Sequence, residues 1–139
     1  MEESGSYRTP SVEHARVSDA MTSKAIVTCS REAGLRDMGR LMSSHHIHSL
    51  VTSLGGAAGW GVVSDVDIAI AALSRPEATA GELAVPATGI PRDAPLMRAI
   101  EVMRKERTSH LIVADTESGE PTGIISALDI AGIVGWGEA

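Results

Sequence analysis

Aromatic residues and cysteine are almost missing from this sequence of 139 residues. It has no phenylalanine, one tyrosine and two tryptophans, so its core has to be built from alanine, valine, isoleucine, leucine and methionine. Its single cysteine, Cys29, excludes an intramolecular disulfide and favours a reducing compartment. No apolar run approaches the roughly 18 residues that span a bilayer, and the acidic, polar beginning is not typical of a secretory signal. We therefore expect a soluble, cytoplasmic protein that has no membrane partner.

Positive charge is also scarce. Twelve lysines and arginines stand against eighteen acidic residues, which gives a net charge of −6 and argues against a nucleic-acid partner. The hydrophobic residues make up 43% of the chain, which is enough for a buried core. The chain as a whole is therefore not expected to be disordered. The length allows one compact domain or two small repeated units.

The sequence contains an internal repeat. A shift of 61 residues superimposes Arg31 on Arg92, Ala33 on Ala94, Leu35 on Leu96, Met42 on Met103 and Leu50 on Leu111. A shift of 62 superimposes Gly61 on Gly123, Ser64 on Ser126, Asp67 on Asp129, Ile68 on Ile130 and Ala69 on Ala131. The two copies span residues 17–73 and 80–136 and follow a polar tail, 1–16. We expect a hairpin loop to absorb the extra residue of the second copy.

Both copies predict the same order of elements, β-α-β-β-α. Leu96, Ala99, Ile100 and Met103 form a helical stripe, as do Leu35, Met38 and Met42 in the first copy. Short strands are expected near 25–28, 50–52 and 61–63, and again near 87–90, 111–113 and 123–125. A short apolar helix closes each copy, at about 65–73 and 127–134. We expect an α+β fold in which the two copies pack sheet against sheet with pseudo-two-fold symmetry.

Three segments resemble motifs of the cystathionine-β-synthase (CBS) domain family. The first copy begins with Val17-Ser18-Asp19-Ala20-Met21-Thr22, and both copies end with a Gly-h-h-Ser-x-x-Asp motif, where h is apolar. These motifs are residues 61–67 and 123–129. Two such domains in tandem form a Bateman module, and the resemblance covers everything except the N-terminal tail.

The resemblance implies a regulatory module that binds an adenosine-type ligand, such as AMP, ADP, ATP or S-adenosylmethionine, in clefts between the two repeats. It implies that the Ser and Asp of each motif bind the ribose, while other residues line the base or approach the phosphates. The ribose residues are Ser64, Asp67, Ser126 and Asp129. The other ligand-binding positions are Ala25, Ile26, Ile47, His48, Ala87, Thr88, Ser109 and His110. An ionised carboxylate can accept from two vicinal hydroxyls, and a strand-to-helix junction directs N–H groups at a bound anion.

The same motif has a purely structural interpretation. Ser-x-x-Asp before an apolar helix is a capping box, with Ser64 or Ser126 as the N-cap and Asp67 or Asp129 at the third helical position. On this interpretation the chain is a ligand-free protein–protein interaction or scaffold module. A hydrolase that uses Ser, His and Asp is disfavoured, because a capping hydroxyl is already engaged, so we expect no enzyme activity and no catalytic residues.

The two copies differ in ways that bear on the ligand. The second copy begins with Ala80-Gly81-Glu82-Leu83-Ala84 and lacks the Met-Thr pair, and Asp65 in the first motif faces Ala127 in the second. An additional carboxylate opposes a nearby phosphate. The motif with Ser126 and Asp129 is therefore expected to favour a phosphorylated adenosine, with His110 as the nearby basic residue. Since few basic residues are placed to meet a triphosphate, AMP is expected to bind better than ATP.

Three further features favour structural interpretations. His45, His46 and His48 predict an exposed helix end, with His48 in a cleft, rather than a metal site, because adjacent helical residues point to different faces. Residues 55–61 are glycine-rich but lack the Gly-Lys-Ser/Thr of a phosphate loop, so they predict a hairpin turn. Cys29 is expected to be an inert thiol.

The apolar stripes of both copies also bear on oligomeric state. Together with the apolar closing helices, including residues 68–73, they lead us to expect a homodimer. A regulated partner protein is also expected, and the sequence does not identify it.

Overall fold

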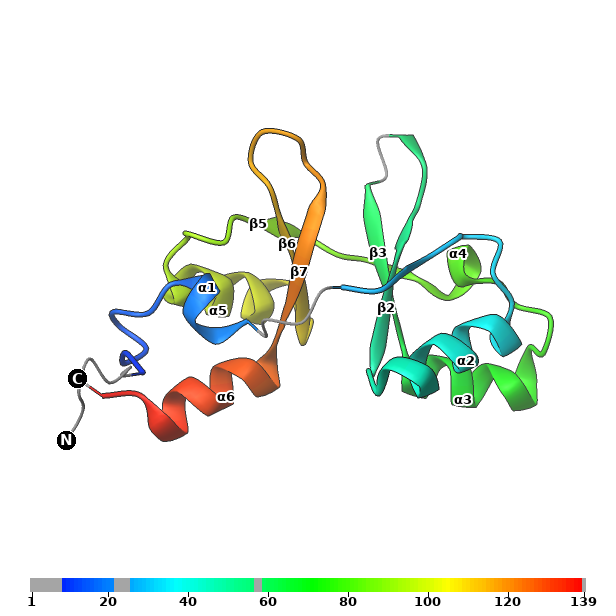
Figure 1. The fold of residues 1–139 in the computed structure, drawn as a ribbon, viewed down its shortest axis with the longest axis horizontal. Helices are drawn as coiled ribbons and strands as arrows, with labels where there is room; N and C mark the ends of the chain where they lie inside the picture. Colours follow the sequence, from blue (N-terminus) through cyan, green and yellow to red (C-terminus); the bar gives the residue numbers. More distant parts are fainter. Residues whose placement is uncertain (1–8, 22–25, 57–58, 139) are drawn as a thin grey trace. The chain divides into compact units, whose positions relative to one another are not determined.

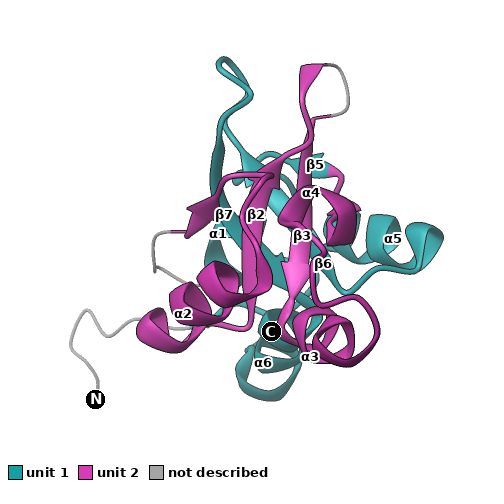
Figure 2. Ribbon diagram, turned by 90° about the vertical axis from the view of Figure 1, so that its right-hand side faces the viewer, with its two compact units in different colours: residues 1–25, 89–139 teal, residues 26–88 magenta. Residues whose placement is uncertain are grey.

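The chain forms two small sheets, each with helices beside it (Figure 1). The computed structural model describes residues 9–21, 26–56 and 59–138. The chain divides into two compact units, which Figure 2 shows in different colours: unit 2 is residues 26–88, and unit 1 joins residues 1–25 to residues 89–139. The fold is α+β, as the sequence predicts.

The elements of the two units follow the predicted order, with three short additions. Unit 2 contains β1 (Thr28–Cys29), α2 (Leu35–His45), β2 (Ser49–Ser53), β3 (Trp60–Ser64), α3 (Asp65–Ser74), α4 (Ala80–Leu83) and β4 (Val85–Pro86). Unit 1 contains α1 (Val17–Ala20), β5 (Gly89–Ile90), α5 (Leu96–Glu106), β6 (His110–Ala114), β7 (Pro121–Ser126) and α6 (Ala127–Trp136). The sequence does not predict α1, α4 or β4, which are too short to show a periodicity.

The two sheets share the arrangement of three strands, and the sheet of unit 2 has a fourth. In unit 2, β1 runs parallel to β2, and the antiparallel β2–β3 hairpin is extended by β4. In unit 1, β5 runs parallel to β6, and β6 pairs with β7 in an antiparallel hairpin. Each hairpin leads directly into a closing helix, α3 or α6, so the last residue of the hairpin is also the helix N-cap. This junction carries the Ser-x-x-Asp motif.

The extra residue of the second copy lies in a strand and not in the hairpin loop. The loops span residues 54–59 and 115–120, so they have the same length. Val113 of β6 pairs with Gly123 of β7, but the next residue, Ala114, pairs with Pro121, so the register shifts by one residue at this point. The expectation that the loop absorbs the insertion is therefore wrong: a β-bulge accommodates one residue without moving the rest of the ladder.

The predicted helical stripes form the cores of the two units. Met38 and Met42 of α2 pack with Leu50 and Val63 in unit 2. In unit 1 the core of α5, β6 and β7 consists of Leu96, Ala99, Met103, Leu111, Val113 and Ile125. Since large aromatic residues are scarce, these cores are filled by aliphatic and methionine side chains.

The short helices α1 and α4 occupy equivalent places in different units. The N–H groups of Val17 and Ala80 donate to Ala94 and Ala33 at 2.9 and 2.8 Å, and both side chains are fully buried. Consequently the beginning of the first copy packs into unit 1, and the beginning of the second copy packs into unit 2. The compact units are thus a different division of the chain from the sequence repeat.

Both long helices end in the same unusual conformation. His46 follows α2 with φ 52°, and Arg107 follows α5 with φ 55°, which are left-handed values that favour glycine. His45 and His46 are exposed at this end of α2, as the sequence predicts. Within the described ranges, none of the helices combines the length and the apolar character that crossing a bilayer requires.

Candidate functional site

The motif of unit 1 forms a complete capping box at the start of α6. Ser126 is the last residue of β7 and the N-cap of the helix. Its Oγ accepts a hydrogen bond from the N–H of Asp129 at 3.2 Å, and its own N–H donates to Asp129 Oδ2 at 2.8 Å. The capping box that the sequence predicts for this motif is therefore present.

The motif of unit 2 has the same geometry at the start of α3. Ser64 Oγ accepts from the Asp67 N–H at 3.2 Å, and the Ser64 N–H donates to Asp67 Oδ2 at 3.0 Å. Ser64 and Asp67 are half-buried, as are Ser126 and Asp129. The two serines and two aspartates are therefore accessible from solvent and locked in one orientation.

The caps leave part of each aspartate unused. Each cap employs only Oδ2 of the carboxylate, and neither Oδ1 atom accepts a hydrogen bond from a residue that the structure describes. An ionised carboxylate has about four acceptor positions. Both aspartates can therefore cap their helix and still accept hydrogen bonds from another molecule.

The sheet of unit 1 places two further predicted residues beside its motif. His110 lies directly opposite Ser126 in the β6–β7 ladder. The Ser109 hydroxyl lies 3.0 Å from His110 Nδ1, and the Ser109 carbonyl accepts from the N–H of Ala127 at 2.8 Å. The unit therefore brings Ser109, His110, Ser126 and Asp129 together at one end of its sheet.

The corresponding end of unit 2 carries a hydrogen bond between a histidine and a carboxylate. His48 Nδ1 lies 2.9 Å from Asp65 Oδ2, and because a carboxylate only accepts, the Nδ1–H must be the donor. This hydrogen bond holds the pKa of the Asp65 carboxyl below its ordinary value, and a hydrogen bond from the Val66 N–H lowers it further. Sequence reasoning identified both His48 and Asp65 but did not pair them.

The other predicted positions are less well defined. Ala25 lies outside the described residues. Ile26 precedes β1, and the parallel register of β1 with β2 puts it at the same end of the sheet as Ser49 and Ser64; Ile47 follows α2 and is half-buried. Ala87 and Thr88 connect β4 to β5, and the Ala87 N–H donates to the Trp60 carbonyl at 3.0 Å. Their ligand-binding roles stay predictions.

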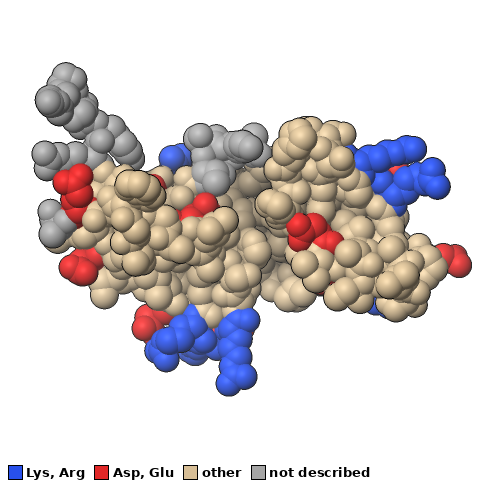
Figure 3. Space-filling model, turned by 90° about the horizontal axis from the view of Figure 1, so that it is seen from below, with Lys and Arg blue, Asp and Glu red and all other residues tan. Residues whose placement is uncertain are grey.

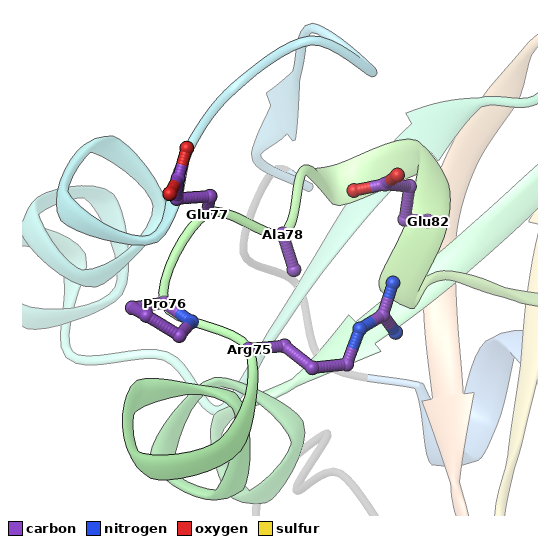
Figure 4. A pocket seen from close by; sticks show the side chains of 5 residues that line it. All are labelled: Arg75, Pro76, Glu77, Ala78 and Glu82. Atoms are coloured by element: carbon purple, nitrogen blue, oxygen red, sulfur yellow. The ribbon is translucent and has the colours of Figure 1, made fainter.

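Two cavities lie away from these motifs. One, of about 280 Å³, lies in unit 2 between the end of α3 and α4 and is lined by Arg75, Pro76, Glu77, Ala78 and Glu82 (Figure 4). The other, of about 390 Å³, lies in unit 1 at the loop end of the sheet, where Arg92, Asp93, Asp115 and Thr122 are among its lining residues. No sequence motif marks either cavity, because loops without a fixed spacing supply most of the lining.

The described side chains bear on two further kinds of site, a metal site and a reactive thiol. Within the described residues no three His, Cys, Asp or Glu side chains gather as a set of metal ligands. Burial raises the pKa of the Cys29 thiol, which lowers the fraction of reactive thiolate at neutral pH.

Comparison with known proteins agrees with this architecture. A model of the CBS domain family matches residues 81–135, and no curated protein matches the chain. The CBS domain of a bacterial CNNM/CorC family Mg²⁺ transporter in complex with ATP superimposes with a TM-score of 0.73 at 18% identity, over 91% of this chain and 92% of that one.

Two further solved structures are similar over almost their full length. A CBS domain pair in complex with 5′-methylthioadenosine and S-adenosyl-L-methionine has a TM-score of 0.70 at 22% identity, covering 87% of this chain and 96% of that one. A CBS domain protein from Pyrobaculum aerophilum in complex with AMP also has a TM-score of 0.70, at 21% identity, covering 87% and 98%. Residues 81–135, within the second copy of the repeat, are therefore similar to the CBS domain, and the chain as a whole has the fold of a CBS domain pair.

Proposed function

We propose that this protein is a non-catalytic regulatory module that binds an adenosine derivative through its Ser-x-x-Asp motifs. The observation that carries the proposal is the capping box that forms twice and leaves Oδ1 of Asp67 and of Asp129 available. The three similar CBS structures, which contain AMP, ATP, or 5′-methylthioadenosine with S-adenosyl-L-methionine, support the same class of ligand.

The chemistry suits a ribose. Two vicinal hydroxyls can donate to one ionised carboxylate, and hydrogen bonds to a charged acceptor are about twice as strong as neutral ones. Because each aspartate is already oriented by its cap, binding requires no further ordering of that side chain. The motif serines can contribute a third polar contact through their remaining donor or lone pair.

We expect unit 1 to be the better site for a phosphorylated ligand. His110 lies directly opposite Ser126 in the β6–β7 ladder, where its imidazole is the basic group beside this motif. Residue 127 is alanine, so the first turn of α6 carries only the Asp129 carboxylate. AMP is therefore the ligand we expect to bind tightest, ahead of ADP and ATP.

A thermal-shift panel tests the proposal. The ligands are AMP, ADP, ATP, S-adenosylmethionine, NAD and cyclic dinucleotides. At 100 times its dissociation constant a ligand stabilises the folded state by about 2.7 kcal/mol, which raises the melting temperature of a protein of this size by several degrees. The matched control is the variant with Asp67→Asn and Asp129→Asn, since asparagine keeps an acceptor for the cap and removes the charge. Calorimetry then measures the affinity of any ligand that gives a shift.

If no ligand in the panel shifts the melting temperature of the wild-type chain, the proposal is wrong. An equal shift in the wild type and in the double Asn variant would place binding away from the motifs.

The second candidate function is a ligand-free interaction module, and a specific observation favours it. The closing helices expose large apolar side chains, and few charged residues cover them in the view of Figure 3. These side chains are Val66, Ile70 and Leu73 of α3, and Leu128, Val134 and Trp136 of α6. We propose that these helices bind a second molecule of the same protein, forming a homodimer. The reason is that α3 and α6 both present an exposed apolar face.

Analytical ultracentrifugation tests this dimer. Leu73 is 92% exposed, so Leu73→Arg should preserve folding and convert a dimer into a monomer. Met97→Arg on α5, where Met97 is 53% exposed, is the control and should leave the dimer intact. A wild-type monomer at high concentration would contradict the proposed dimer.

A further inference from the structure

The first turns of α3 and α6 are capped alike at two of their three leading N–H groups. The first N–H donates to a backbone carbonyl, from Asp65 to His48 at 2.9 Å and from Ala127 to Ser109 at 2.8 Å. The third N–H donates to the motif serine in both helices. Any difference between the two helix starts therefore lies at the second N–H, on Val66 or Leu128.

At that position unit 2 supplies its own anion. Asp65 Oδ1 accepts from the Val66 N–H at 2.8 Å, and Asp65 Oδ2 accepts from His48 Nδ1 at 2.9 Å. Both oxygens of this carboxylate are thus engaged, and both lie at the start of the helix that holds the Ser64–Asp67 cap. In unit 1 the equivalent residue is Ala127, which has no carboxylate to offer to Leu128.

Asp65 therefore affects an approaching phosphate in two ways, through its negative charge and through its hydrogen bond to the Val66 N–H. A helix N-terminus attracts negative charge, and in α3 this preference is already met by Asp65 in addition to Asp67. A phosphate that approached Ser64 and Asp67 would meet a second carboxylate, and it would find the Val66 N–H occupied. A neutral or cationic substituent would meet neither obstacle.

We propose that Asp65, held by His48, is a specificity-determining residue that makes the motif of unit 2 select adenosine derivatives without a phosphate. Unit 1, which lacks this carboxylate, accepts a phosphorylated adenosine. This inference rests on the proposed function, and it adds the class of ligand that each motif takes. A matching pair of substitutions, Asp65→Ala and Ala127→Asp, exchanges the two arrangements.

The test is calorimetry of the full chain with AMP and with 5′-methylthioadenosine, which has the same nucleoside but no phosphate. An Asp129→Asn background weakens the motif of unit 1, so that binding reports on unit 2. In this background Asp65→Ala should increase AMP affinity about tenfold, because it removes a like charge and frees an N–H donor. The affinity for 5′-methylthioadenosine should change by less than about twofold, since that ligand carries no charge for Asp65 to repel.

Two controls separate charge from shape. Asp65→Asn keeps an acceptor for Val66 but loses the charge, so it should reproduce most of the gain. Asp37→Ala removes the same charge from the first turn of α2 and should leave AMP affinity unchanged. Conversely, Ala127→Asp in an Asp67→Asn background should weaken AMP binding about tenfold. Circular dichroism verifies that every variant is folded.

The results distinguish this inference from the proposed function. If AMP binds but neither exchange alters the ratio of AMP to 5′-methylthioadenosine affinity, the inference is wrong while the proposed function stands. If neither ligand binds the folded wild-type chain, both are overturned.

Discussion

Units 1 and 2 share the arrangement of three strands and of the closing helix, and they differ in the charged side chains beside that helix. Both cap their closing helix with a serine and an aspartate, at hydrogen-bond distances that agree within 0.2 Å. Only unit 2 adds the Asp65–His48 pair beside the cap. Duplication has therefore conserved the elements that hold the junction together, while side chains that the junction does not require have diverged.

Arg31 and Arg92 are equivalent residues of the two copies, at the other end of the sheets, and their side chains also make different contacts. Arg31 lies beside Glu32, with Nε 3.2 Å from Oε2, and its Nη1 donates to the Leu54 carbonyl at 3.3 Å. Its counterpart Arg92 lines the cavity of about 390 Å³ in unit 1. In both units the backbone carbonyl of the arginine accepts one hydrogen bond at 2.8 Å, from Gly81 or from Ser18. The backbone role is thus kept and the side-chain role is not.

The largest expected effect tests whether the cores are equivalent. Leu50 and Leu111 are counterparts and are both fully buried. Leu50→Ala and Leu111→Ala should each destabilise the protein by about 2–5 kcal/mol, because each leaves a cavity in a close-packed core. Urea unfolding followed by circular dichroism measures both. A loss below about 1 kcal/mol in one variant alone would show that the two cores are not equivalent.

The next effect tests whether the two motifs contribute differently to AMP binding. Asp129→Ala should weaken the tightest AMP binding at least tenfold, or about 1.4 kcal/mol, because it removes a charged acceptor. Asp67→Ala should change it by less than about twofold. Calorimetry at constant pH measures both affinities. Equal losses in the two variants, or tighter binding of ATP than of AMP, would contradict the asymmetry between the motifs.

The caps themselves should contribute equally to stability. Without ligand, Ser64→Ala and Ser126→Ala should each reduce the free energy of unfolding by about 1 kcal/mol, since each orphans one helical N–H. Ser44→Ala in the last turn of α2, where Ser44 is exposed, is the control and should change stability by at most about 0.5 kcal/mol. A large difference between the two cap variants would mean that one junction has additional support.

The smallest effect concerns pH and is confined to unit 2. Because its pKa is lowered in the folded state, Asp65 stabilises the fold above the ordinary carboxyl pKa and loses this effect as the pH falls through the lowered value. The contribution should be a few tenths of a kcal/mol, since the His48 and Asp65 side chains are 87% and 50% exposed.

Melting curves of the wild type and Asp65→Asn from pH 6 to pH 3 measure this contribution. The difference should shrink below roughly pH 4. A difference that grew as the pH fell from 4 to 3 would have the wrong sign and would contradict the assigned hydrogen bonds.

Much of the fold follows from local sequence patterns. The stripes of α2 and α5 and both capping boxes are predictable because each depends on residues three or four apart along one helix. The repeat is predictable because the sequence matches itself at shifts of 61 and 62 residues. The placement of α1 and α4 is not predictable in this way. Val17 and Ala80 are buried by backbone contacts to residues 77 and 47 positions away, at Ala94 and Ala33, and no periodicity encodes such a contact.

The candidate site also has features that local sequence patterns predict and features that depend on the tertiary structure. The sequence by itself determined that Ser64 and Asp67, and Ser126 and Asp129, act together at helix starts, because their spacing is one helical turn. Only the tertiary structure decided that His48 meets Asp65 and that the extra residue of the second copy forms a bulge in β7. Both depend on the register between antiparallel strands, which opposes Ser49 to Ser64 and Val113 to Gly123. That register is set by which side chains the whole sheet buries, and no short segment of the chain contains this information.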